Sequence, residues 1–307
     1  MAFPARVTRT RPALAALLAL AAAACAGTGA TPTAAPAPAP TASAPAPAPT
    51  TTAAASAATP APSPVRTTAA GTGATPAPAW LGTRVLPTDA SGYGIAGRTP
   101  PELVNRRIVT VDELPPPADG AFHASIQRVP VAVLARSTWS TRCPVTPAEL
   151  RYVTVGFRGF DGRAHTGELL VHRDAAADLV TVFRRLFAAG FPIERMRVST
   201  RAERDAPPTG DGNTTGVFNC RPATASTGWS EHAYGRAVDV DPFQNPYVRG
   251  RLVLPELAVA YADRGRVRPG LITAGGPVVA AFRAVGWTWG GSWQAPKDYM
   301  HFSSTGR

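Results

Sequence analysis

Two histidines and two aspartates in the last third of the chain have residue types that can hold a catalytic metal ion. His232, Asp239 and His301 offer imidazole nitrogen and carboxylate oxygen, which are common zinc ligands, and three protein ligands leave a fourth position for water. One Zn²⁺ ion held there would lower the pKa of the bound water towards about 7. Asp298, which precedes His301 by three residues, could accept a proton from that water. This pattern predicts hydrolysis by a metal-activated water.

The segments around these residues resemble two motifs of a known family. Ser230-x-His232-x-x-Gly235-x-Ala237-x-Asp239 is similar to the S-x-H-x-x-G-x-A-x-D motif of the zinc D-alanyl-D-alanine carboxypeptidases. This family includes VanY-type carboxypeptidases and the L-alanyl-D-glutamate endolysins of phages. The tail, WGGSW followed by DYMHF, resembles the second family motif, and NTTGVFNCRP resembles the family segment that ends in an arginine. The resemblance covers roughly residues 130 to 307.

The resemblance implies a fold and a role for each residue. It implies one compact domain of the Hedgehog/DD-peptidase type, in which His232, Asp239 and His301 bind one catalytic zinc ion. Asp298 would be the catalytic acid and base. Arg221 would support the substrate carboxylate or the developing oxyanion, because a fixed guanidinium binds such groups well. The alternative for Arg221 is a surface position or a structural ion pair.

One departure from the family pattern leaves the scissile bond open. Several relatives carry Glu in an E-x-W-H tail, whereas this chain has Asp298-Tyr299-Met300-His301. The shorter acid and the missing tryptophan are nearer to the endolysin branch. The target could be D-Ala-D-Ala, L-Ala-D-Glu or a cross-bridge, and the enzyme could be a carboxypeptidase or an endopeptidase.

The N-terminal residues predict export. Arg6, Arg9 and Arg11 precede the apolar run ALAALLALAAAAC, which is typical of a signal peptide over residues 1–25. Its end resembles a lipobox, so Cys25 is expected to carry a lipid anchor; simple cleavage nearby is the alternative. Residues 26–80 are rich in Ala, Thr and Pro and are predicted to form a disordered linker. The expected location is the outer face of the membrane or the cell wall.

Charge and cysteine content agree with that compartment. The formal net charge of +11 suits an anionic polymer such as a cell wall. Nucleic acid is not expected as a partner, because the sequence has no basic helix or basic cluster interleaved with aromatic residues. Cys143 and Cys220 form an even pair in an exported chain, which predicts a disulfide, with two buried free thiols as the alternative.

The elements that must position the site follow from local patterns. Residues 81–125 read as an irregular extension, and residues 126–307 read as the peptidase domain. Hairpins that alternate with isolated helices predict an α+β fold, an antiparallel sheet with flanking helices. The expected elements are strands at 150–157 and 166–172 joined at Asp161-Gly162, a helix capped by Asp174 and ended by Gly190, strands at 193–200 and 236–241, and a helix from Pro277 to Gly286.

Taken together, the sequence predicts an exported, monomeric zinc metallopeptidase that hydrolyses amide bonds in peptidoglycan peptide stems. Membrane contact would be through the lipid anchor alone. Two alternatives remain open: a non-catalytic, zinc-containing peptidoglycan-binding module on the same fold, and a structural lipoprotein whose His and Asp residues brace a core. His123, His165 and His172 lie outside any motif and are expected to be structural or surface residues.

Overall fold

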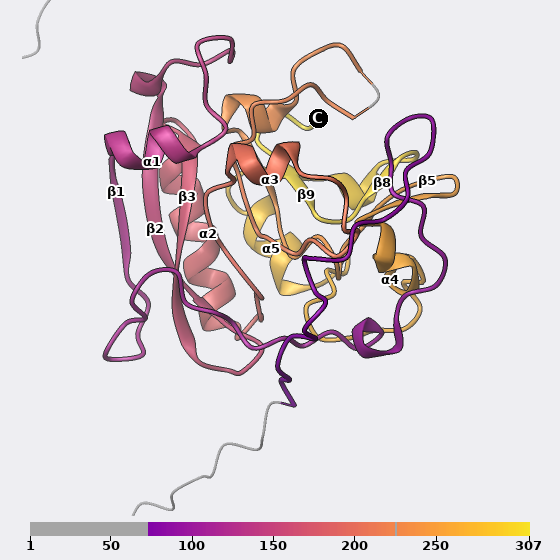
Figure 1. The fold of residues 1–307 in the computed structure, drawn as a ribbon. Coiled ribbons are helices and arrows are strands. Elements are labelled where there is room, and N and C mark those ends of the chain that lie inside the picture. Colours follow the sequence, from indigo (N-terminus) through magenta and orange to yellow (C-terminus); the bar gives the residue numbers. More distant parts are fainter. Residues whose placement is uncertain (1–72, 225) are drawn as a thin grey trace, which may run out of the picture. The chain divides into compact units, whose positions relative to one another are not determined.

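The computed structural model of the protein describes residues 73–224 and 226–307 (Figure 1). The predicted signal peptide, Cys25 and the linker up to residue 72 lie outside the described residues. The α-helices of the described part are α1 (Val131–Arg136), α2 (Ala176–Ala188), α3 (Arg201–Asp205), α4 (Val259–Ala262) and α5 (Pro277–Arg283). Short 3₁₀ helices cover Pro101–Leu103, Pro147–Glu149, Glu231–Tyr234, Glu256–Ala258 and Gly290–Ser292.

The longest strands form the predicted hairpin. β2 (Leu150–Arg158) and β3 (Ala164–His172) pair antiparallel along their whole length, and β1 (Ala124–Arg128) adds an outer strand beside β2. The turn contains Gly162, whose φ of 75° is a left-handed conformation that glycine adopts without a steric penalty. The hairpin prediction is confirmed.

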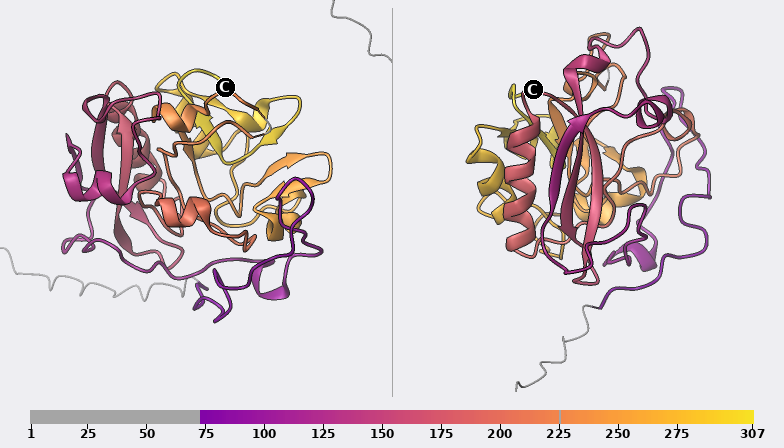
Figure 2. Two further views of the ribbon diagram at one scale, coloured as in Figure 1. Left: turned by 45° about the horizontal axis from the view of Figure 1, so that its top comes forward. Right: turned by 90° about the vertical axis from the view of Figure 1, so that its left-hand side faces the viewer.

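Both faces of β2 and β3 are covered, which explains why these two strands are almost continuously buried, whereas β1 is exposed. Val153 and Val155 face α2, which presents a stripe of buried residues at helical spacing. Figure 2 shows α2 lying along the sheet. Leu150 and Tyr152 point to the other face, where they pack near Cys220 in a second cluster. Alternate residues of β2 therefore belong to two different hydrophobic clusters, one on each face of the sheet.

Two smaller sheets carry the predicted site. In one, β9 (His301–Ser303) lies between β4 (Ala237–Asp239) and β7 (Thr288–Trp289). In the other, β5 (Tyr247–Arg249) lies between β6 (Leu252–Leu254) and β8 (Lys297–Asp298). All pairs between these strands are antiparallel, which is compatible with the predicted α+β class, and the strands of the described residues are divided among three sheets instead of one.

The segment before β1 is fastened to the rest by a buried arginine. Arg106 makes a two-pronged ion pair with Glu194, with N···O distances of 2.8 and 2.7 Å. It also donates to the carbonyl of Asp211, and its backbone N–H donates to the Tyr261 hydroxyl. The guanidinium lies 4.5 Å from the ring centroid of Phe243. A buried charge with this many partners is satisfied, so the segment is an integral part of the unit.

The predicted strand at 193–200 is wrong. This segment makes only isolated bridges, among them Met196 with Thr215. The reason is that its hydrogen bonds go to separate segments: backbone bonds join it to Arg158, Glu168 and Thr215, and the N–H of Glu194 donates to the buried carboxylate of Asp241 at 3.0 Å. The alternation of apolar residues correctly indicated an extended segment, but it could not show that this segment lacks continuous hydrogen bonding to a neighbouring strand.

Two predicted boundaries also differ from the structure. The N-cap of α2 is Ala175 and makes no side-chain cap bond, whereas Asp174 accepts from Arg236 at 3.2 Å. The strand expected at 236–241 is shorter, because Asp241 has a φ of 42°, which ends the extended backbone. The helix predicted from Pro277 is present as α5.

Cys143 and Cys220 form the predicted disulfide. It connects the loop after α1 to the residue directly before Arg221. Among residues 73–224 and 226–307, none of the helices has the length and apolar character needed to cross a bilayer.

Candidate metal centre

The three predicted ligands converge on one point. His232 lies on the 3₁₀ helix Glu231–Tyr234, and Asp239 and His301 are direct partners across β4 and β9. The Nε2 atom of His232 is 3.2 Å from an Asp239 carboxylate oxygen and 3.2 Å from Nδ1 of His301. Nδ1 of His301 lies 3.3 Å from the other Asp239 oxygen. The possible ligand atoms all lie within 4.8 Å of one another, which is close enough for one ion.

The outer nitrogen of each histidine ring is held by a main-chain carbonyl. Nδ1 of His232 donates to the carbonyl of Val217 at 2.6 Å, and Nε2 of His301 donates to the carbonyl of Arg307 at 2.8 Å. A carbonyl can only accept, so the proton of each neutral ring is on its outer nitrogen. The inner nitrogens then present lone pairs to the shared point, as metal-binding histidines require.

Glycines allow the backbone to bring these ligands together. Gly235 ends the His232 helix with a φ of 68°, and a Cβ there would lie 2.7 Å from the backbone nitrogen of His172. The chain can therefore turn sharply between His232 and Asp239. The backbone of Gly216 exchanges two hydrogen bonds with Asp239, at 3.1 and 3.0 Å, which fixes that ligand from its other side.

Asp298 lies beside the trio, and the surroundings of its carboxylate are unusual. It is on β8, and one of its oxygens, Oδ1, is buried with no hydrogen-bond partner among the described residues. Gly290 allows this approach, because a Cβ there would lie 2.7 Å from the Asp298 carbonyl oxygen and 3.3 Å from Cβ of His301. Burial and the nearby negative charge of Asp239 raise the pKa of Asp298 to about 7.

The electrostatics of the trio favour a cation. Burial alone would raise the pKa of Asp239, but the two imidazoles lower it below its ordinary value, His232 more than His301. Burial opposes protonation of His301, yet its bond to Asp239 raises the pKa of this imidazole to about 9. A negative carboxylate thus attracts positive charge to the centre of the cluster, where a metal ion would replace a proton.

The trio and Asp298 open into a cavity of about 380 Å³. Arg221 is among the residues that line it and donates one hydrogen bond to the carbonyl of Pro222 at 3.1 Å. The remaining walls are mainly apolar or aromatic. They include Trp229, Tyr247, Leu254, Trp293, Pro296 and Met300, while polar groups come from Thr224, Ser230, Glu231 and Arg307.

Sequence reasoning missed Tyr247 and Leu254 as wall residues. They lie on β5 and β6, on either side of Arg249-Gly250-Arg251, and they are cross-strand partners. A glycine between two short apolar runs is a hairpin signal that could have indicated their pairing. Neither residue belongs to a motif of the site.

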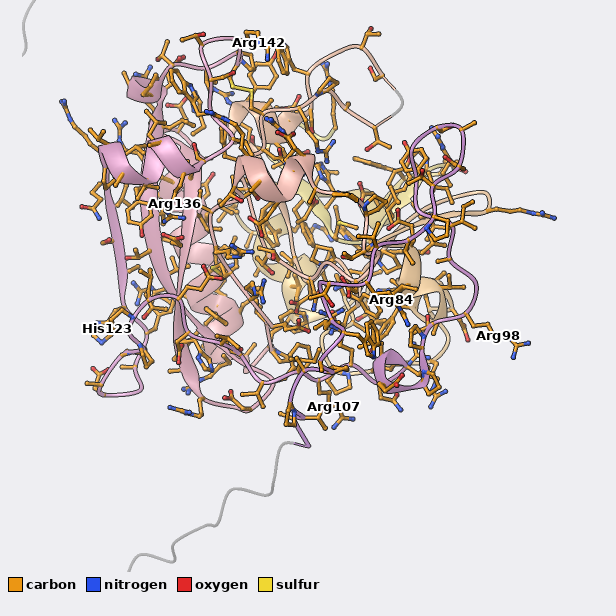
Figure 3. All side chains as sticks on the ribbon, in the orientation of Figure 1. Arg84, Arg98, Arg107, His123, Arg136 and Arg142 are labelled. Atoms are coloured by element: carbon orange, nitrogen blue, oxygen red, sulfur yellow. A yellow bond between two sulfur atoms is a disulfide. The ribbon has the colours of Figure 1, made fainter. Side chains whose placement is uncertain are left out.

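The other histidines are not part of this centre. His123 is exposed near the start of β1, where it contacts Asp119 (Figure 3). His165 is buried between Asp112 and Asp161, and His172 is buried beside Arg236. All three are structural or surface residues in the described part of the chain, as predicted.

Residues 223–304 match a family model described as D-alanyl-D-alanine carboxypeptidase. The resemblance to this family is confirmed. The matched segment contains His232, Asp239, Asp298 and His301, whereas Arg221 lies two residues before it. Searches of curated proteins and of solved structures found no match. The D-alanyl-D-alanine carboxypeptidases of this family are zinc enzymes, and the trio of this chain could bind such an ion.

Proposed function

We propose that this protein is a zinc peptidase that hydrolyses amide bonds in the peptide stems of peptidoglycan. One observation carries the proposal: at the wall of a cavity, three ligand atoms converge beside a carboxylate oxygen of Asp298 that has no hydrogen-bond partner in the described part of the chain. The family match supports a peptidase of the carboxypeptidase type acting on peptidoglycan-like substrates.

Zn²⁺ bound by His232, Asp239 and His301 would supply a polarised carbonyl and a water that is acidic at neutral pH. The residues around it have separate tasks. The carbonyls of Val217 and Arg307 hold the two imidazoles in the orientation that binding needs. Both are main-chain groups, so this orientation depends on the path of the backbone.

Asp298 would transfer the proton. Its Oδ1 atom is buried without a hydrogen-bond partner among the described residues, so it would be free to accept a proton from the attacking water. The same carboxyl group then donates that proton to the departing amine as the amide C–N bond breaks. Arg221 would place its positive charge near the substrate carboxylate or the oxygen that becomes negative.

The finer assignments are also part of the proposal. We propose the Hedgehog/DD-peptidase fold, a D,D or L,D specificity, and a monomeric protein at the outer face of the membrane or in the cell wall, anchored through lipidated Cys25. The disulfide supports this location, because disulfides persist in oxidising compartments. The positive net charge suits an anionic wall polymer.

The test is mass spectrometry of purified muropeptides after incubation with the zinc-loaded protein. Release of a single alanine would identify a carboxypeptidase, and release of larger stem fragments would identify an endopeptidase. Asp298→Asn should keep one zinc per chain, since Asp298 is not a ligand, while its rate falls by about a hundredfold to ten-thousandfold.

The matched control is Asp205→Asn, an exposed aspartate paired with Arg204, which should leave turnover unchanged. Full activity of Asp298→Asn would exclude the role given to Asp298. No product from the zinc-loaded wild type would overturn the proposed function, and tight peptide binding without cleavage would then favour the binding module.

A further inference from the structure

The segment from Val217 to Arg221 holds the turn of His232 through main-chain groups. The carbonyl of Val217 accepts the outer N–H of the His232 ring at 2.6 Å. The N–H of Asn219 donates to the carbonyl of His232 at 3.1 Å. The carbonyl of Arg221 accepts from the N–H of Ser230 at 3.2 Å. The position and orientation of this imidazole therefore depend on where the segment lies.

Cys220 attaches the same segment to a distant part of the chain. Its disulfide partner, Cys143, lies in the loop after α1, 77 residues earlier. The N–H of Cys220 also donates to the hydroxyl of Thr138, in that same loop, at 3.0 Å. The two neighbours of Cys220 contact the turn of His232 instead. The segment is thus held between the turn that carries a metal ligand and a loop fixed by the disulfide.

Other contacts limit how far this segment could move. Phe218 is 2% exposed and packs in the same cluster as Cys220 and Leu150. The carbonyl of Cys220 accepts from the Arg204 guanidinium at 3.4 Å, which is long for a hydrogen bond. Without the disulfide, the buried ring of Phe218 would keep the segment near its place. Cys220 and Arg221, which come after that ring, would be held less precisely.

We propose, on the basis of the zinc centre of the proposed function, that the Cys143–Cys220 disulfide positions His232 and makes the zinc affinity of the centre depend on oxidation. When the disulfide opens, the supports that Asn219 and Arg221 give to the turn of His232 loosen, and the bond from the ring to Val217 loses its alignment. Loss of such an outer partner weakens metal binding about tenfold to a hundredfold. A loosened partner is expected near the lower end of that range.

Opening the disulfide needs a reductant, and a phosphine or a dithiol can supply the two electrons. A phosphine attacks one sulfur and the S–S bond breaks; water then gives its oxygen to the phosphine oxide and its two protons to the two thiols. A dithiol gives the same two thiols by exchange and becomes a disulfide itself. Cys220 is 7% exposed and Cys143 is half-buried, so the attack is expected at Cys143.

The experiment measures the Kd for zinc by competition with a fluorescent chelator, before and after reduction with tris(2-carboxyethyl)phosphine. A phosphine is used because thiol reductants bind zinc themselves. Reduction of the wild type should raise the Kd about tenfold, with two free thiols per chain found by titration. The double variant Cys143→Ser/Cys220→Ser should show the same raised Kd with and without the phosphine, which separates the effect from zinc binding by the new thiols.

The matched control is Leu103→Ala, which removes a fully buried side chain from a cluster that does not include the segment. It should lower the denaturant concentration at the unfolding midpoint while the Kd for zinc stays within about twofold of the wild type. A Kd raised equally in Leu103→Ala and in the double variant would assign the change to general loss of stability and overturn the inference.

The readout is separate from turnover, so the two proposals can fail separately. A reduced wild type with both thiols free and a Kd within about twofold of the oxidised protein would overturn this inference and leave the proposed function intact. This arm does not depend on the folding of the double variant. A wild type that binds zinc in a disulfide-dependent way but cleaves no muropeptide would overturn the proposed function alone. A wild type that binds no zinc would overturn both.

Discussion

His165 and His232 are both buried histidines in contact with aspartate, yet their surroundings differ in a decisive way. The ring of His165 has a carboxylate at each nitrogen, Asp112 at 2.8 Å and Asp161 at 3.1 Å. His232 has a main-chain carbonyl at one nitrogen and shares the space at the other with His301 and Asp239.

The comparison shows that direction matters more than residue type. The two nitrogens of an imidazole point away from each other, so carboxylates on both sides of His165 cannot share one ion. At His232 the outer N–H donates a hydrogen bond to a main-chain carbonyl. The lone pair of the inner nitrogen then meets a second imidazole and a carboxylate at one point. The first arrangement joins parts of the fold, and the second can bind a metal ion.

The largest effect is expected when one of the three predicted metal ligands is removed. His301→Ala should reduce zinc from one per chain to almost none, measured by elemental analysis after dialysis. Turnover should fall by at least about a thousandfold, because Lewis-acid stabilisation is worth several kcal/mol and each 1.36 kcal/mol is tenfold in rate. A variant that retains stoichiometric zinc would show that the trio is not the metal centre.

A smaller effect is expected from the matched change at the other cluster. His165→Ala should lower the free energy of unfolding by about 1–3 kcal/mol, since it leaves Asp112 and Asp161 without their shared partner. Zinc content and kcat/KM should stay within about twofold of the wild type. Urea denaturation measures the free energy of unfolding, and elemental analysis of the same preparation measures the zinc content. Loss of zinc would show that the His165 cluster contributes to metal binding.

The smallest effect concerns pH. Burial, together with the charge of Arg236, lowers the pKa of His172 below its ordinary value. The unfolded chain then binds more protons than the folded one, so this contribution to stability is complete above about pH 6.5 and is lost as the pH falls through the folded pKa. His172→Gln should show a shallower decline between pH 7.5 and pH 5 in urea denaturation. An equal slope in both proteins would assign the decline to other groups.

The sequence was most informative where chemistry restricts the residue. The trio and Asp298 could be predicted because the motifs around them resemble those of a known family, and the glycines at 235 and 290 lie at positions where a Cβ would clash. The hairpin of β2 and β3 could be predicted because nine-residue strands carry enough periodicity to be recognised.

The part of the cavity wall formed by Tyr247 and Leu254 could not be predicted in the same way. Tyr247 and Leu254 lie on strands of three residues, which are too short to show a period. The burial of Arg106 runs against the usual exposure of arginine, and its partner Glu194 lies 88 residues away. Such contacts depend on how distant segments meet, which local pattern does not contain.

The contacts of Arg106 also bear on when the domain can form. Its partners follow it in the chain by 88, 105 and 155 residues. A fold dominated by contacts of such long sequence separation pays the entropy of closing large loops before it gains their energy, so it folds slowly. The segment synthesised early has to wait for residues synthesised much later. Until then the contacts of Arg106 cannot form, and the segment before β1 stays unattached to the rest of the unit.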